Sequence, residues 1–331
     1  MTNVSNDERT VAIAAVRAAA RVCRVVQDDL VNDQTLQKKD RSPVTVADFA
    51  SQAVVCAMLS DRLSANAIVG EEDSQQLRQP EQAALLAGVV QQVRSVRDGE
   101  VRESDVLGWI DMGGADASAD RYWTLDPIDG TKGFLRREQY AVALALIESG
   151  RVVLGVLGCP NLASESGTGC LLVAQRGQGA ELVGLDEGSI ANRITVSDVS
   201  DMADARFCES VESAHSDQSQ SVQIARHLGI DNEPVRMDSQ AKYAAVGRGD
   251  ASIYLRLPTR ADYREKIWDH AAGTIVVEEA GGRVSDIDGR PLEFTHGRQL
   301  EANRGVVATN GRLHDSVIAA IQATSDPGAA S

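Results

Sequence analysis

Several features of membrane and secreted proteins are lacking in this sequence of 331 residues. No apolar run approaches the roughly 20 residues of a membrane-spanning helix, and the polar, acidic segment Met1–Thr10 lacks the hydrophobic region of a secretory signal. Aromatic residues make up only 4% of the chain, so the core must be built from Ala, Val, Leu and Ile. These absences predict a cytoplasmic protein with no membrane partner.

The sequence also lacks cysteine pairs with C-x-x-C spacing and histidine pairs with the spacing of a zinc site. The cysteine count is odd and no two cysteines have C-x-x-C spacing, which predicts buried free thiols in a reducing compartment. No two histidines have the spacing of a zinc site, and the absence of a G-x-x-x-x-G-K-[ST] loop argues against a P-loop nucleotide triphosphatase. The residues concerned are Cys23, Cys56, Cys159, Cys170, Cys208, His215, His227, His270, His296 and His314.

Positive charge is scarce, because 33 Lys and Arg residues stand against 48 Asp and Glu residues, for a net charge of −15. This excess argues against nucleic acid and against an acidic membrane surface as partners. A small anionic substrate would require bound cations or a local basic cluster to overcome the field of the protein. Arg260, Arg264 and Lys266 form one such cluster, although they could equally belong to a solvated loop.

What is present predicts an α/β protein of two domains, since 331 residues with 43% hydrophobic residues and 28 glycines suit that class. The first domain, 1–188, is predicted to be α+β. One apolar stripe predicts its first helix: Val11, Ala15, Ala18, Val22 and Val25. Its predicted helices are 7–30, about 45–63 and 80–97, followed by a loop over 97–120 without a recognisable motif. Its predicted strands are 67–70, 122–125, 140–148, 151–158, 170–175 and 180–183.

The second domain, 189–331, alternates strands with helices, which is the pattern of an α/β layer. Its predicted strands are 206–211, 235–238, 251–257 and 305–309. Its predicted helices are 218–228, 240–247, 267–279 and 313–323. Small, polar residues from about 325 onward predict a disordered tail.

One stretch brings several chemical groups together. An apolar run with strand character delivers two carboxylates three residues apart, Asp126 and Asp129. Pro127 stiffens the link between them, Gly130 permits a sharp turn, and Thr131 stands where a helix could begin. Hard oxygen ligands beside free backbone N–H groups suit both a divalent metal and a phosphate group. The alternative is an ordinary Asp-Pro/Asp-Gly turn in a loop.

Three further acids stand at the ends of predicted elements. Glu71 follows a short strand, and its alternative role is in a solubilising acidic loop. Asp48 has the spacing of a capping box from Thr45 and lies in the first turn of its predicted helix, where the helix dipole would hold it ionised. Asp269 also lies in the first turn of a predicted helix, where a structural acid is the alternative.

Together these five carboxylates predict a metal site. Oxygen ligands favour Mg²⁺, Mn²⁺ or Ca²⁺ over zinc. Because so many carboxylates exceed what one Mg²⁺ needs, the sequence favours a site with more than one metal. Such sites clamp the attacking and leaving oxygens of an in-line phosphoryl displacement.

The motifs resemble those of a known family. They are similar in order and separation to the motif set of the inositol monophosphatase-like, lithium-sensitive, magnesium-dependent phosphatases: Asp126-Pro127-Ile128-Asp129-Gly130-Thr131, Gly70-Glu71-Glu72 and Trp268-Asp269-His270-Ala271-Ala272-Gly273. Within that superfamily the chain resembles the 3'(2'),5'-bisphosphate nucleotidases from about Val11 to about Ile321. The stretches that carry this second resemblance are 40–45, 131–136, 211–215, 238–243 and 254–258.

The resemblance implies a layered α-β-α-β-α sandwich, with two or three Mg²⁺ ions bound between its two domains. The implied metal ligands are Glu71, Asp126, Asp129, Asp269 and the backbone carbonyl of Ile128. Asp48 and Thr131 would activate the attacking water, and backbone N–H groups of Gly130 and Thr131 would hold the scissile phosphate. The remaining substrate contacts would come from His215, Ser239, Lys242, Arg256 and Asp269.

The resemblance further implies hydrolysis of the 3'-phosphate of adenosine 3',5'-bisphosphate, and of 3'-phosphoadenylyl sulfate, by a lithium-sensitive monomer that clears a by-product of sulfate assimilation. An inositol polyphosphate or monophosphate phosphatase stays open as an alternative, as does a catalytically silent metal or nucleotide sensor. Two of the implied substrate contacts also have alternatives without a function in the site. Lys242 could be solvated on its helix, and His215 could be an ordinary loop histidine.

Overall fold

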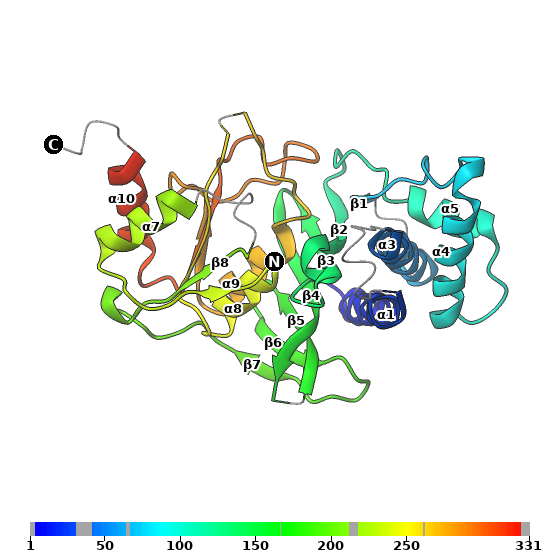
Figure 1. Ribbon diagram of the computed structural model, residues 1–331, viewed down its shortest axis with the longest axis horizontal. Coiled ribbons are helices and arrows are strands. Elements are labelled where there is room, and N and C mark those ends of the chain that lie inside the picture. The colour runs from blue at the N-terminus through cyan, green and yellow to red at the C-terminus, as the bar shows by residue number, and fades with distance from the viewer. Residues whose placement is uncertain are drawn as a thin grey trace.

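The computed structural model describes residues 4–30, 42–63, 67–165, 167–211, 218–260 and 262–325. Five layers follow one another along the long axis of the molecule: helices, a seven-stranded sheet, helices, a five-stranded sheet and helices again (Figure 1). Three apolar clusters fill the spaces between these layers. The predicted α-β-α-β-α sandwich is confirmed.

The first layer covers one face of the seven-stranded sheet. Its first helix was correctly predicted, except that Val25 is 42% exposed and Val26 is buried, because the buried stripe continues from Val22 by a spacing of four. The predicted loop over 97–120 was wrong in part, since it contains a helix that buries Val106 and Ile110. The helices are α1 (Asn6–Leu30), α3 (Ser42–Arg62), η1 (Pro80–Gln82), α4 (Ala83–Val96) and α5 (Glu103–Asp111).

Helix α3 begins at Ser42, three residues before the predicted capping residue. A proline such as Pro43 is tolerated there, because its missing N–H would have no partner in the first helical turn. Asp48 therefore lies in the second turn, and its predicted place in the first turn was wrong. By length and hydropathy the window 44–62 could cross a membrane, but 78% of it is buried inside the protein, which is typical of a core helix.

The seven-stranded sheet keeps the order of the sequence, with β1 and β2 parallel and all later neighbours antiparallel. The predicted hairpin at Ser149 and Gly150 is confirmed, and both residues have a positive φ (49° and 72°), as a two-residue turn requires. The strands are β1 (Ala67–Gly70), β2 (Arg121–Asp129), β3 (Ala141–Glu148), β4 (Arg151–Ser164), β5 (Gly167–Gln175), β6 (Gly179–Gly184) and β7 (Asn192–Ile194).

Both faces of this sheet are buried, so its strands read as continuous apolar runs. On β3, Leu144 and Leu146 face the first helical layer, whereas Ala143 and Ala145 face the middle helices. The middle face must be nearly flat, because a Cβ on Gly155 would lie 2.4 Å from the side chain of Ile275. Small residues thus allow the middle helices to approach the sheet closely.

The second sheet has the order β11-β12-β10-β8-β9. Its strands are β8 (Phe207–Glu209), β9 (Val235–Arg236), β10 (Ile253–Arg256), β11 (Arg283–Ser285) and β12 (Val306–Thr309). Helices α8 (Ala241–Gly247) and α9 (Ala271–Glu279) form the middle layer, and α7 (Gln218–Leu228) and α10 (His314–Ser325) form the outer layer. The two remaining short helices are α6 (Thr131–Leu135), directly after β2, and η2 (Met202–Asp204).

The helix predicted to begin at Ile267 begins instead at Ala271, after a turn over 268–270. Asp269 therefore lies ahead of α9 and outside its first turn, contrary to the prediction. Strand β11 was not predicted, since three residues carry too little pattern. The predicted tail lies outside the described residues, apart from Ser325, which ends α10. All five cysteines are buried and free, as predicted.

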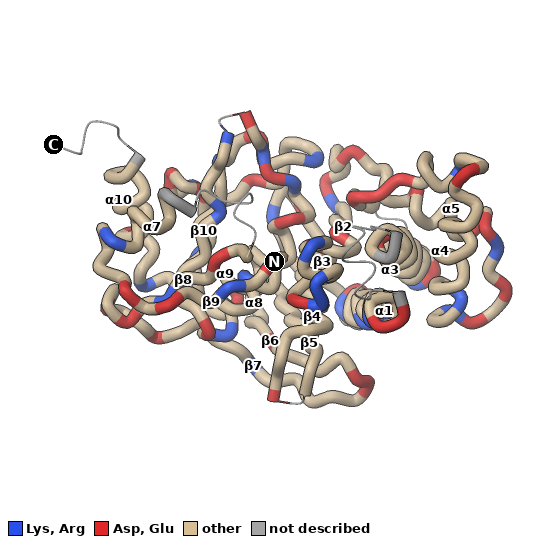
Figure 2. Tube along the Cα trace, in the orientation of Figure 1, with Lys and Arg blue, Asp and Glu red and all other residues tan. Residues whose placement is uncertain are grey.

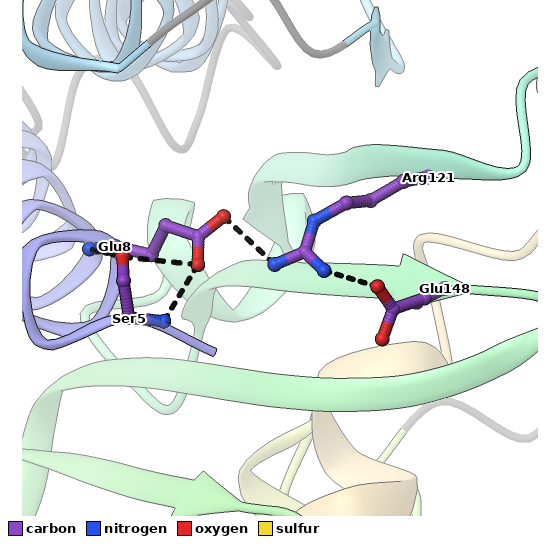
Figure 3. Close-up of polar contacts among 4 residues, drawn as sticks. All are labelled: Ser5, Glu8, Arg121 and Glu148. Atoms are coloured by element: carbon purple, nitrogen blue, oxygen red, sulfur yellow. Dashed lines mark hydrogen bonds and ion pairs between the residues drawn. The ribbon is translucent and has the colours of Figure 1, made fainter. Parts of the chain in front are cut away.

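Charged residues of both signs are interspersed along the tube in Figure 2, at the helical end with α1, α4 and α5 and at the end with α7 and α10. One cluster ties α1 to the sheet (Figure 3). The guanidinium of Arg121, at the start of β2, donates to Glu8 at 2.8 Å and also to Glu148 of β3. The second carboxylate oxygen of Glu8 accepts from the backbone N–H of Ser5 at 2.8 Å.

Candidate active site

Strand pairing places the first two predicted ligands side by side. In the parallel pair of β1 and β2, Gly70 lies opposite Leu125, so Glu71 and Asp126 follow at neighbouring strand positions. The backbone N–H of Glu71 donates to the carbonyl of Leu125 at 3.2 Å. Burial, followed by the charge of nearby Asp129, raises the pKa of Glu71.

A bulge brings the second aspartate of β2 into the same group. The strand was predicted to stop at Leu125, but it continues to Asp129. Asp126 lies opposite Ala143 of β3, whereas Asp129 lies opposite Ala141, so three steps on β2 face two steps on β3. In a regular strand, residues three apart point to opposite faces; one extra residue removes that alternation.

A tight contact closes the end of β2. Gly130 has φ +90°, and a Cβ there would lie 2.8 Å from Cβ of Ser239, which itself has φ +67°. Glycine is required at this position because it alone permits both the conformation and the approach. Helix α6 begins at Thr131, as predicted.

A cavity of about 210 Å³ lies at this end of β2. Seven of the predicted site residues line it: Asp129, Gly130, Thr131, Ser239, Lys242, Arg256 and Asp269. Lys132, Asp238, Gln240, Tyr254 and His270 complete the lining. Residues from α6, α8, β10 and the turn before α9 thus meet at the carboxylate cluster.

The carboxylates carry more negative charge than the protein around them neutralises. Burial, followed by the charges of Glu71, Asp129 and Asp269, raises the pKa of Asp126 well above its usual range. Asp126 is 2% exposed, and its Oδ1 has no hydrogen-bond partner among the described residues. Burial and the charges of Asp129 and Glu71 raise the pKa of Asp269 similarly. An oxygen-only group of this kind fits a hard divalent cation.

Asp48 lies behind this cluster on α3. It is 8% exposed, and burial, followed by the charges of Glu72 and Glu71, raises its pKa well above the usual value. The predicted dipole stabilisation of its charge was wrong, because burial dominates and the helix start lies a turn away. Helix α3 also holds the site through Ser51, whose hydroxyl donates to the carbonyl of Pro127 at 3.0 Å.

Two cations, Lys242 and Arg256, line the same cavity as the carboxylates. Lys242 is 3% exposed, so the alternative of a solvated lysine is wrong. Burial lowers its pKa, while the charge of Asp129 raises it. Arg256 donates to Glu265 at 3.2 Å; although burial opposes it, the charge of Glu265 helps to raise the pKa of Arg256 above its usual value. Positive charge is therefore held in place beside Asp129.

A profile of the inositol monophosphatase family matches residues 6–326 of this chain. The chain belongs to the inositol monophosphatase family. A 3'(2'),5'-bisphosphate nucleotidase of Oryza sativa is 45% identical to it, over 95% of this chain and 93% of the relative. An enzyme of the same name from Schizosaccharomyces pombe is 43% identical, over 96% and 95%.

The fold also has solved relatives in the inositol monophosphatase family. The inositol monophosphatase from Anabaena (Nostoc) sp. PCC 7120 superposes with a TM-score of 0.61 at 23% identity, over 95% of this chain and 94% of that structure. At this level of identity the likeness supports the fold alone.

Three other predictions concerned His215, Ile128 and the basic loop with Arg260, Arg264 and Lys266. His215 lies outside the described residues. The side chain of Ile128 is 1% exposed and packs in the core. Of the basic loop, Arg260 pairs with Asp262 at 3.5 Å with both side chains exposed, whereas Nζ of Lys266 lies 5.8 Å from the ring centroid of Trp268.

The sequence analysis missed the residues that support these inositol monophosphatase motifs. The backbone N–H of Gln240 donates to Asp129 at 2.6 Å, and its side chain bonds the carbonyl of Trp268 at 2.8 Å and the N–H of Gly273 at 3.0 Å. Gln240 belongs to the stretch 238–243 that carries the resemblance to the nucleotidases, but no role was predicted for it. Gln240 joins the end of β2 to the turn that carries Asp269.

A second supporting network lies under that turn. His270 is 1% exposed and bonds Tyr243 through Nδ1 at 2.7 Å and Glu265 through Nε2 at 3.1 Å. Glu265, Asp269 and His270 lie close enough to share a metal ion. Because Glu265 and His270 already bond each other and Glu265 also bonds Arg256, we interpret the pair as support for the turn.

Proposed function

We propose that this family member hydrolyses the 3'-phosphate of adenosine 3',5'-bisphosphate to AMP and phosphate in a Mg²⁺-dependent reaction. One observation carries the proposal: a single cavity is lined by the carboxylates Asp129 and Asp269 and also by the cations Lys242, which is buried, and Arg256, which is partly buried. A substrate with two phosphates needs two such subsites, one beside metal ligands and one beside fixed positive charge. The names of the relatives in rice and fission yeast support the same substrate.

We assign the metal to Glu71, Asp126, Asp129 and Asp269, with the carbonyl of Ile128, and expect two or three Mg²⁺ ions. The donor set fits, because it consists of oxygens alone and includes the unpartnered Oδ1 of Asp126. When bound, such cations neutralise charge on the transferring phosphoryl group and acidify water. The same site accounts for an expected inhibition by Li⁺.

The remaining steps belong to residues of the chain. Thr131, exposed at the cavity, would orient the attacking water, and Asp48 would accept its proton. Attack in line with the 3'-oxygen breaks the P–O3' bond, and the ribose oxygen takes a proton as it leaves. Gly130 and Thr131 would hold the scissile phosphate through their backbone N–H groups.

The second phosphate and the nucleoside would lie against Ser239, Lys242 and Arg256, with His215 on the nucleoside. Lys242 and Arg256 can bond phosphate oxygens and are held in place by burial and by Glu265. These contacts require no particular group beyond the 5'-phosphate, so we also propose 3'-phosphoadenylyl sulfate as a substrate. The cellular role would be to clear a by-product of sulfate assimilation.

We further propose that the protein acts as a cytoplasmic monomer. The five buried free thiols are compatible with a reducing compartment. A division into domains 1–188 and 189–331 is proposed as well, with the active site between them.

The test is phosphate release by the purified protein with Mg²⁺, comparing adenosine 3',5'-bisphosphate, inositol 1,4-bisphosphate and inositol 1-phosphate, each repeated with EDTA and with Li⁺. We expect a strong preference for the nucleotide that EDTA abolishes and Li⁺ reduces. A preference for an inositol phosphate would overturn the roles of Ser239, Lys242 and Arg256. No release from any substrate would favour a silent metal or nucleotide sensor.

A further inference from the structure

Glu71 and Asp269 come from opposite halves of the chain, and one side chain outside the cavity joins their segments. The guanidinium of Arg298 donates through Nη2 to the carbonyl of Gly70, immediately before Glu71, at 2.5 Å. The same guanidinium lies 4.7 Å from the ring centroid of Trp268, immediately before Asp269. Arg298 therefore contacts the neighbour of a carboxylate on each side.

Arg298 also fixes the loop that flanks β1. Its Nη1 donates to the carbonyl of Ala115 at 2.9 Å and to that of Gly113 at 3.4 Å. This loop is itself paired with β1, because the N–H of Gly70 donates to Gly113 at 2.8 Å. The planar, five-donor guanidinium can serve three carbonyls at once, which an ammonium on a flexible stem cannot do in this fixed geometry.

The backbone of Arg298 is fixed to the other half. Its carbonyl accepts from the N–H of Ile267 at 3.2 Å, and the N–H of Leu300 donates to the backbone carbonyl of Glu265 at 2.9 Å. The segment 298–300 thus pairs with the segment that leads into Asp269. The backbone of Arg298 is therefore fixed to the segment before Asp269, and its side chain bonds Gly70, the residue before Glu71.

We propose that Arg298 is a positioning residue that holds Glu71 and Asp269 at the separation a divalent cation requires. The inference rests on the proposed function, which makes both carboxylates metal ligands. Groups that orient metal ligands typically change metal affinity by about 10–100-fold when they are replaced. Arg298→Lys keeps the charge near Glu71 but loses the three-carbonyl fork, so we expect it to weaken divalent-cation binding about tenfold.

Arg97 offers a matched control. Its guanidinium lies 4.5 Å from the ring centroid of Trp109 and pairs with Asp61 at 2.8 Å, so it also combines an indole contact with polar bonds. It lies in the first helical layer, between α4 and α5, and outside the carboxylate cluster. Arg97→Lys should lower the melting temperature without changing metal affinity.

The experiment titrates metal-free protein with Mn²⁺ in the absence of substrate, by calorimetry, for the wild type, Arg298→Lys, Arg298→Ala and Arg97→Lys. Melting temperatures in EDTA report on folding. We expect weaker Mn²⁺ binding for both Arg298 variants and unchanged binding for Arg97→Lys. At saturating Mn²⁺, the KM for adenosine 3',5'-bisphosphate should change less than twofold in Arg298→Lys, since that residue does not line the substrate cavity.

Unchanged Mn²⁺ affinity in Arg298→Lys would overturn the inference while leaving the proposed metal site intact. Equal weakening in Arg298→Lys and Arg97→Lys would also overturn it, because it would indicate general destabilisation. A wild-type protein that binds no Mn²⁺ would overturn the proposed function itself, and with it this inference. If Arg298→Ala fails to fold, the lysine variant still decides.

Discussion

The two ends of strand β2 carry charges with opposite surroundings. At its start, one cation, Arg121, lies between the carboxylates of Glu8 and Glu148, whose side chains are 13% and 25% exposed (Figure 3). At its end, Asp126 and Asp129 lie against further carboxylates, and every charge that acts most strongly on Asp126 is negative. The same strand thus holds one compensated and one uncompensated cluster.

The difference separates a structural role from a functional one. A compensated pair contributes to stability within the chain, because each charge replaces its lost hydration with a partner. An uncompensated cluster costs free energy on folding, and a cation from outside the chain can offset the charge that Lys242 and Arg256 leave. Substitutions at the two ends should therefore change different quantities, and in opposite directions for stability.

The largest effect is expected for Asp126→Asn. We expect kcat to fall on the order of 10³-fold, about 4 kcal/mol, because a metal ligand is lost. In EDTA the same variant should have a higher melting temperature than the wild type, because one of several repelling charges is removed. Phosphate release and thermal unfolding in EDTA and in Mg²⁺ measure both effects.

The isosteric exchange keeps the shape of the cluster, so a lower melting temperature in EDTA would contradict the view that Asp126 is uncompensated. The matched control is Glu148→Gln at the other end of β2. It removes one partner of Arg121 and should lower the melting temperature in both conditions without changing kcat.

The second effect concerns the cation that the cluster does have. Lys242→Ala should raise the KM for adenosine 3',5'-bisphosphate about 10–100-fold, since a hydrogen bond to a charged group contributes about 1.5–3 kcal/mol. For a small phosphoester with one phosphate, the KM should change much less. Steady-state kinetics on the two substrates check this; equal changes would remove Lys242 from the nucleotide site.

Sequence patterns located the uncompensated cluster well, for a physical reason. Acids that directly follow an apolar run, such as Glu71 and Asp126, are visible because the contrast between the apolar run and the carboxylate is local. Their adjacency then follows from pairing of β1 with β2. Strongly periodic helices were also predictable; α7 matches its predicted bounds of 218–228.

Residues that hold the cluster in place were not predictable. Arg298 bonds the carbonyl of Gly70, 228 positions away, and a backbone carbonyl leaves no mark in the sequence. Gln240 likewise bonds backbone groups of Trp268 and Gly273. The start of α9 was misplaced because Ile267 and Trp268 are apolar residues that pack in the core from a turn, which a periodic pattern does not distinguish from helix.

The third effect tests the compensated end directly. Arg121→Met keeps the apolar stem but removes the charge, and it leaves Glu8 and Glu148 without their cation. We expect the free energy of unfolding to fall by about 2 kcal/mol and kcat to stay within twofold of the wild type. Urea unfolding and phosphate release measure the two quantities. A large loss of kcat would mean that the two ends of β2 are coupled, and would break the comparison.

The smallest effect concerns a neutral group that is fully satisfied. His314 is 0% exposed and bonds the hydroxyls of Ser285 at 2.8 Å and Thr309 at 3.0 Å, at the junction of α10 with the second sheet. Burial, followed by the charge of Arg283, lowers its pKa to about 4. Because the unfolded chain protonates this group near pH 6.5, the unfolded state binds more protons between those values.

Stability contributed by His314 is therefore present above about pH 6.5 and is lost as the pH falls toward 4. His314→Gln cannot titrate in this range, so its melting temperature should fall less between pH 6.5 and pH 4.5 than that of the wild type. The matched control is His227→Gln on the exposed face of α7, which should keep the wild-type slope. If the melting temperature of His314→Gln changes with pH as much as that of the wild type, His314 is protonated in the folded protein. Hydrogen bonds to two hydroxyls would then not keep a buried histidine neutral, whereas Arg121 does keep its two carboxylates paired.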